Sequence, residues 1–184
     1  INDNWTANLI ASQSRAVVDD YSSFPWGCYS SICQYSGLGN TFDQNGNYDI
    51  YDYRNPNDTY ITNQFKAGLN GQFNTGTWQH NVSVELSQTY KRHAQYDAIN
   101  TLVGTGNIYT NSVTYSPTTT LGNHYKSLDS QQTALNLLDQ IDFNGAWSVL
   151  VGGKLLHLNE NAYDADGNNI RDTHLNRFLP QLAL

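Results

Sequence analysis

The sequence predicts an all-β protein, an antiparallel up-and-down meander of about six long strands. Three observations predict this class. Apolar and polar residues alternate over long runs, the connections between the runs are alternately long and tight, and a Trp stands just after each tight-turn end. Successive side chains of a strand point to opposite faces, so each alternating run has one apolar and one polar face.

The alternation is clearest in residues 60–92, two runs that meet at Asn74-Thr75-Gly76-Thr77. From Trp78 to Tyr90 it lasts twelve steps, which is about 40 Å at about 3.3 Å per residue. An ordinary strand has only about 5–6 residues. Tilted by about 45°, the run rises about 28 Å, close to the apolar band of about 25 Å on an outer-membrane barrel. We therefore interpret residues 60–92 as a membrane β-hairpin.

The remaining strands follow from the same pattern. Residues 4–18 form the first strand. A third hairpin pairs Thr133–Phe143 with Trp147–Leu158 across Asn144-Gly145, a strong hairpin signal. The last run is Leu175–Leu184. Between the hairpins, turn-forming residues predict long external loops at about 19–56, 96–126 and 161–173.

The order of connections favours a membrane barrel over a soluble sandwich. Bacterial outer-membrane barrels have short periplasmic turns and long external loops, with aromatic girdles at both interfaces. Trp5, Trp78 and Trp147 lie on the apolar parity beside the tight-turn end and are expected to form one such girdle. Residues 1–184 are thus predicted to be part of a larger barrel, because six strands do not close a membrane barrel.

Charged residues test this assignment. The charged side chains that lie opposite the apolar face are Lys66, Glu85, Lys91 and Lys154. Arg15 and Asp139 share the apolar parity, so either a bulge shifts the phase or those strand ends lie outside the hydrocarbon. His80 and His157 also fall among the apolar residues and are expected to be girdle or rim groups.

Composition limits the possible functions. The net charge of −7 argues against nucleic-acid binding. No apolar run approaches the roughly 20 residues of a membrane helix. Cys28 and Cys33 are the only cysteines, and we predict a small disulfide ring in an oxidising compartment, the alternative being two free thiols.

The chain resembles the middle of the barrel of TonB-dependent siderophore receptors of Gram-negative bacteria. The resemblance covers nearly all of the sequence and is strongest at residues 135–143, at Trp147-Ser148-Val149-Leu150-Val151-Gly152-Gly153-Lys154 and at residues 178–184. It implies a 22-stranded barrel in the bacterial outer membrane, a ferric siderophore as the transported ligand, and the TonB energy-coupling complex as a partner through parts outside this chain. It also implies an N-terminal plug domain, which is absent from these 184 residues.

Loop aromatics and a cation are the candidate ligand-binding residues, and no catalytic constellation is present. An aromatic, anionic iron chelate could be held by stacking and by Arg or Lys contacts; the alternative is that these residues only pack the loops. The candidates are Trp26, Tyr29, Tyr35, Tyr48, Tyr51, Tyr53, Arg54, Tyr109, Tyr115 and Tyr125.

Other readings stay open. The sequence Asp164-x-Asp166-Gly167-Asn168 is similar to part of a calcium loop but lacks the closing Glu, so we expect an ordinary hairpin loop and no metal site. A soluble secreted β domain, carbohydrate-binding or adhesive, and a passive porin are the alternatives to the receptor.

Overall fold

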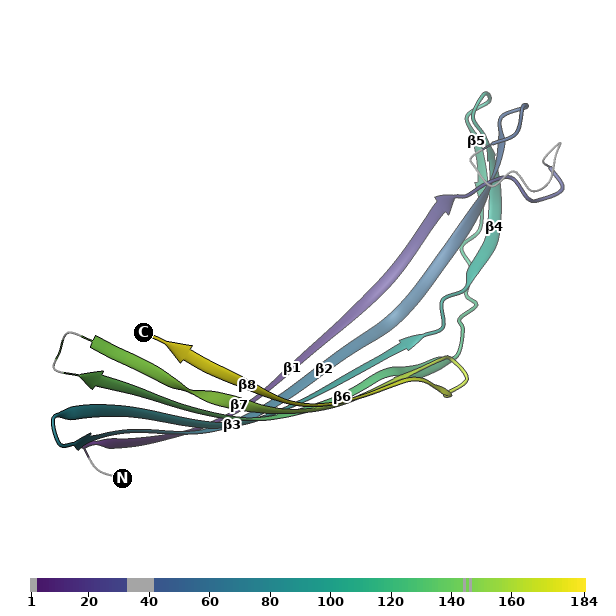
Figure 1. Ribbon diagram of the computed structural model, residues 1–184. Helices are drawn as coiled ribbons and strands as arrows, with labels where there is room; N and C mark the ends of the chain where they lie inside the picture. The colour runs from purple at the N-terminus through teal and green to yellow at the C-terminus, as the bar shows by residue number, and fades with distance from the viewer. Residues whose placement is uncertain (1–2, 33–41, 144, 146) are drawn as a thin grey trace. The chain divides into compact units, whose positions relative to one another are not determined.

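The computed structural model describes residues 3–32, 42–143, 145 and 147–184. Within these residues it contains eight strands and no helix. The strands are β1 (Trp5–Pro25), β2 (Asn47–Thr75), β3 (Trp78–Tyr96), β4 (Asn100–Asn107), β5 (Ser112–Tyr115), β6 (His124–Phe143), β7 (Trp147–Tyr163) and β8 (Asn169–Ala183). The predicted all-β antiparallel class is confirmed (Figure 1).

All eight strands belong to one sheet. Its order is β5-β4-β2-β3-β6-β7-β8, and β1 pairs with β2. Long strands that follow one another in sequence are therefore neighbours in the sheet, as in an up-and-down meander. Strands β1 and β8 each pair with a single neighbour.

The chain divides into two compact units. Unit 1 comprises residues 1–16, 60–93 and 126–184, and unit 2 comprises residues 17–59 and 94–125. Unit 1 holds both tight turns. Gly76, between β2 and β3, has a φ of 64°, and Gly145, between β6 and β7, has a φ of 68°, a left-handed conformation that favours glycine. Asn144 of the second predicted turn lies outside the described residues.

The strands are longer than the sequence predicted. Residues 19–25 and 47–56, expected in a loop, lie in β1 and β2, and about half of 96–126 lies in strands β4, β5 and β6. The third expected loop, 161–173, shortens to residues 164–168 between β7 and β8. Pairing with neighbouring strands outweighs local turn propensity here.

Asn57 shows how a turn-forming residue fits into a strand. It adopts a φ of 56°, which Asn tolerates better than most residues. Its backbone N–H donates to the Asp19 carboxylate at 2.7 Å. The side chain of a neighbouring strand thus satisfies a donor that the irregular backbone turns away from the ladder.

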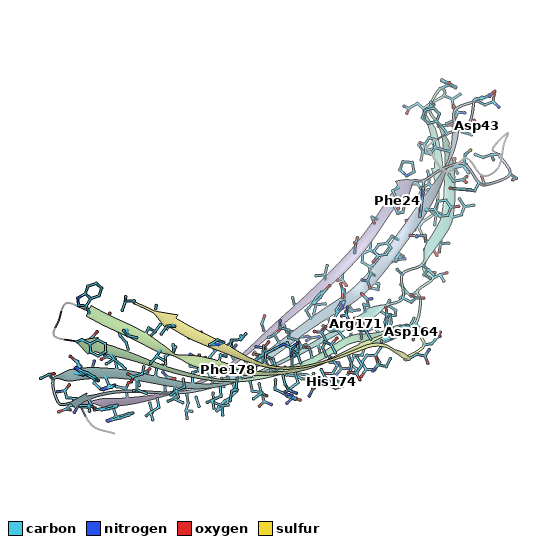
Figure 2. All side chains as sticks on the ribbon, in the orientation of Figure 1. Phe24, Asp43, Asp164, Arg171, His174 and Phe178 are labelled. Atoms are coloured by element: carbon cyan, nitrogen blue, oxygen red, sulfur yellow. The ribbon has the colours of Figure 1, made fainter. Side chains whose placement is uncertain are left out.

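Unit 1 has almost no apolar interior. Ala134 is the one buried residue there among the described Ala, Val, Ile, Leu, Phe, Trp, Tyr and Cys; the others that are buried, Cys28, Ile50 and Ala94, belong to unit 2. Side chains project from both faces of the sheet (Figure 2). Large apolar side chains such as Leu137 (52 % exposed) and Leu155 (55 %) remain uncovered.

Candidate functional site

Cross-strand register shows which side chains share a face in unit 1. Leu135 lies opposite Leu155, and Leu155 lies opposite Phe178. Residues directly opposite each other in a ladder point to the same side. Aromatic contacts extend this face to the other strands: Trp78 meets Phe143 edge-on at 4.9 Å, and Phe73 stacks on His80 at 4.7 Å.

We call this surface the apolar face of unit 1. The ring of Trp5 lies against Gly71, which adds β1 to it. Its main apolar members, by register and alternation, are Trp5, Leu9, Phe65, Leu69, Phe73, Trp78, Val82, Val84, Leu86, Leu135, Leu137, Ile141, Phe143, Trp147, Val149, Val151, Leu155, Phe178 and Leu182.

The three predicted girdle tryptophans lie at the tight-turn end of this face. Trp147 is paired with Phe143, which contacts Trp78. Trp78 and Trp147 are 47 % and 66 % exposed. Six strands therefore present an apolar surface with indoles at one end, and the interfacial role of these indoles stays a prediction.

A belt of polar side chains borders the apolar face at the end away from the tight turns. Gln13 donates to Asn63 at 2.7 Å between β1 and β2. Between β7 and β8 the hydrogen-bonded residues are His157 with Asn176 and Asn159 with His174. The sequence analysis placed His157 at a girdle or rim, but no local pattern indicated that amide and imidazole groups of neighbouring strands would pair.

One ion pair lies within the apolar face. His80 Nδ1 and Asp139 Oδ2 are 2.7 Å apart, with side chains 13 % and 25 % exposed. The β6–β7 register runs without a shift through Asp139 and Val151. Of the two explanations offered for the parity of Asp139, the bulge is absent from the β6–β7 ladder. The carboxylate stays in phase and is hydrogen-bonded to a histidine on β3.

The opposite face of unit 1 carries further polar contacts. Lys66 and Glu85 approach to 3.7 Å, and Asn81 donates to Asp142 at 3.1 Å. These residues have the parity opposite to the apolar face, as predicted for Lys66 and Glu85. The two faces thus differ in chemistry along the length of unit 1.

In unit 2, a buried carboxylate organises the loop that follows β1. Asp49 is fully buried and accepts hydrogen bonds from the backbone N–H groups of Tyr29 and Ser30 at 2.6 and 2.8 Å. The Ser30 hydroxyl donates to the same carboxylate. Cys28, which directly precedes Tyr29, is buried and disulfide-bonded. Its predicted partner Cys33 lies outside the described residues.

Three of the predicted ligand residues gather around Asp49. Trp26 meets Tyr51 edge-on at 5.9 Å, and Trp26 and Tyr29 are each 45 % exposed. Partial burial, then the nearby Asp49 carboxylate and Tyr29, raise the pKa of the Tyr51 phenol above 10.0. Tyr51 is therefore neutral. Its ring is half-buried against Trp26, whereas the rings of Trp26 and Tyr29 remain exposed.

Other predicted ligand residues have packing roles. The rings of Tyr48 and Tyr109 lie against Gly106 and Gly46, where a Cβ atom would clash. Tyr125 accepts a hydrogen bond from Gln95 at 2.8 Å. These contacts support the alternative that some loop tyrosines only hold the loops together. Tyr115 is 50 % exposed on β5, Tyr53 is half-buried on β2, and Tyr35 lies outside the described residues.

Arg54 contacts other residues of unit 2. Its Nη1 donates to the Thr118 carbonyl oxygen, and its guanidinium lies 4.5 Å over the Tyr21 ring. Asp52 accepts from the Thr118 backbone N–H at 2.9 Å. The two side chains together hold the segment before β6, and the ligand contact of Arg54 stays a prediction.

Comparisons with known proteins add no assignment: no protein-family model matches the chain, and no curated protein matches it. Among the described residues, no helix is long and apolar enough to cross a membrane. The same residues include no group of three or more His, Cys, Asp or Glu side chains placed to hold a metal ion.

Proposed function

We propose that unit 1 is part of the wall of an outer-membrane β-barrel, and that the chain serves a receptor for TonB-dependent uptake of a ferric siderophore. One observation carries the first half: the apolar face has no second layer over it among the described residues. A sheet of a soluble domain buries its apolar face against another layer. In a membrane barrel, lipid takes that place.

The dimensions of the apolar face support the proposal. In β2, β3, β6 and β7 the apolar parity runs eight residue steps from the aromatic end to the polar belt: Phe73 to Phe65, Trp78 to Leu86, Phe143 to Leu135 and Trp147 to Leu155. Eight steps are about 26 Å at about 3.3 Å per residue. With the usual tilt of about 40° the rise is about 20 Å, and interfacial side chains extend it toward the band of about 25 Å.

The open edges support a larger barrel. Among the described residues, strands β1 and β8 each have one neighbouring strand, so each leaves a long row of backbone donors and acceptors without a strand partner there. Such an edge is not tolerated in hydrocarbon, and closure requires further strands. The family resemblance implies a total of 22.

The siderophore assignment depends on unit 2 and on the resemblance. Unit 2 contains the connection from β1 to β2 and the connection from β3 to β6. In outer-membrane barrels these long connections are external. The exposed rings of Trp26 and Tyr29 offer flat surfaces on which an aromatic or amphipathic chelate can stack.

Two adjacent leucines test the lipid contact. Leu137 lies on the apolar face and Leu138 on the other, in the same strand. In lipid vesicles, Leu137→Lys should cost about 2–4 kcal/mol of folding free energy, whereas Leu138→Lys should cost clearly less. A soluble domain predicts the reverse, because Leu137 is 52 % exposed and a lysine there would stay in water. The reverse order would overturn the membrane assignment.

Iron uptake tests the second half. Cells that make the protein should accumulate iron from a ferric siderophore, and the accumulation should stop when the energy-coupling complex is removed. A passive porin would pass small solutes regardless of that complex. Uptake that is independent of energy coupling would contradict the receptor assignment while leaving the barrel assignment intact.

A further inference from the structure

The charge of unit 2 indicates which ligands its aromatic surface accepts. Residues 17–59 and 94–125 contain seven aspartates, one arginine and no glutamate or lysine. Their net charge is −6, out of −7 for the whole chain. The acidic character of this protein is thus concentrated in the unit that holds every predicted ligand residue.

The single cation does not offset this charge at the surface. Arg54 gives Nη1 to the Thr118 carbonyl and its guanidinium face to Tyr21. Its Nε is buried and has no hydrogen-bond partner among the described residues. Of the acidic groups, Asp43, Asp49 and Asp52 are buried in the scaffold, while Asp19 and Asp20 are exposed.

The exposed aromatic rings suit the opposite ligand charge. Trp26 and Tyr29 are each 45 % exposed. The Tyr29 backbone N–H donates to the buried Asp49 carboxylate, and the Trp26 ring contacts the ring of Tyr51. The face of an indole or phenol ring attracts a cation, and a field of like sign lowers the local concentration of anions.

We infer that this aromatic surface takes a neutral or positively charged ferric chelate, such as a trihydroxamate, and rejects a triply negative tris-catecholate. The inference rests on the proposed siderophore function and narrows its ligand class. It differs from the expectation of an anionic chelate held by Arg or Lys, since unit 2 contains one arginine and no lysine.

Equilibrium binding to the full-length protein in detergent tests it, with three probes: a ferric trihydroxamate with a free ammonium group, a neutral ferric trihydroxamate, and ferric tris-catecholate. At low ionic strength the positive chelate should bind at least about tenfold more tightly than the catecholate. Added salt should weaken the positive chelate and strengthen the catecholate, because screening reduces attraction and repulsion alike.

A matched pair of variants locates the site. Trp26→Leu should weaken the positive chelate by about two- to fivefold, the loss of one exposed cation–π face. Trp147→Leu, in unit 1, should leave binding unchanged. Equal losses in the two variants would place the ligand elsewhere and overturn the inference.

The outcomes separate the inference from the function on which it rests. Tight binding of the catecholate that salt weakens would overturn the charge selection and leave siderophore uptake standing. Binding of none of the three chelates would overturn the siderophore function itself.

Discussion

Asp43 and Asp164 make the same set of hydrogen bonds, each at the head of an Asp-x-Asx-Gly-Asn sequence. In both turns the carboxylate accepts from the backbone N–H groups two and four residues later, at 2.8 to 3.0 Å. The terminal Asn side chain donates to the second carboxylate oxygen in each. The glycines have φ values of 81° and 83°. The same five-residue turn thus reverses the chain once in unit 2 and once in unit 1.

The two turns should respond unequally to the same substitution. Asp43 is buried, whereas Asp164 is partly exposed. Asp43→Ala leaves buried backbone N–H groups without an acceptor, because water does not reach them, and should lower the free energy of unfolding by about 1–3 kcal/mol. Asp164→Ala should cost less, because water can replace the carboxylate. Denaturant unfolding in detergent measures both, and an equal or larger loss for Asp164→Ala would contradict the assigned difference in burial.

The Asp164 turn should keep its order well into acid. Hydrogen bonds from the Asn168 side chain and from nearby backbone N–H groups lower the pKa of Asp164 from its ordinary 3.8. A carboxyl whose folded pKa is depressed contributes stability above its unfolded pKa and loses it as pH falls through the folded value. The amide NMR shift of Asn168 should therefore titrate below pH 3.8; titration above that pH would exclude these hydrogen bonds.

Removing one partner of the His80–Asp139 pair should lower the folding stability more than replacing both partners. Removing only one partner leaves a polar group on the apolar face, and His80→Leu should cost up to about 3–5 kcal/mol. The double variant His80→Leu/Asp139→Leu should recover most of that loss, because two leucines match the surrounding chemistry. Thermal unfolding in lipid vesicles reports both. A double variant as unstable as the single one would show that the pair is not a local compensation for Asp139.

Tryptophan depth should separate the girdle from the loop. In variants that keep one Trp each, Trp78 and Trp147 should be quenched by lipids brominated near the headgroups more than by lipids brominated near the chain ends. Trp26, in unit 2, serves as the control and should be quenched by neither. Equal quenching at all three positions would contradict the placement of the girdle.

The sequence predicted the class of the fold and the faces of its strands. The period of two that separates Phe65 and Phe73 from Lys66 follows from strand geometry and needs no knowledge of the neighbours. It did not predict how far strands reach into segments rich in turn formers. Asn57 remains in β2 because the Asp19 carboxylate satisfies its N–H, a contact that no local pattern contains.

The sequence predicted which types of residue the candidate site contains, but not how they are arranged in space. Aromatic loop residues were recognised, but the gathering of Trp26, Tyr29 and Tyr51 around Asp49 and the packing of Tyr48 on Gly106 depend on where strands meet. Arg54 was expected to meet an anionic chelate. Its hydrogen bond to the Thr118 carbonyl joins segments distant in sequence, and no local pattern indicates it.

What the sequence by itself determined is which side of each ribbon is oily and which is polar, since alternation is a local property of an extended chain. Only the tertiary structure decided which polar groups compensate one another. His80 meets Asp139 across 59 positions of the chain, and Arg54 meets Thr118 across 64. Such partners are set by the register of strands distant in sequence, and the register depends on all the pairs in a ladder together.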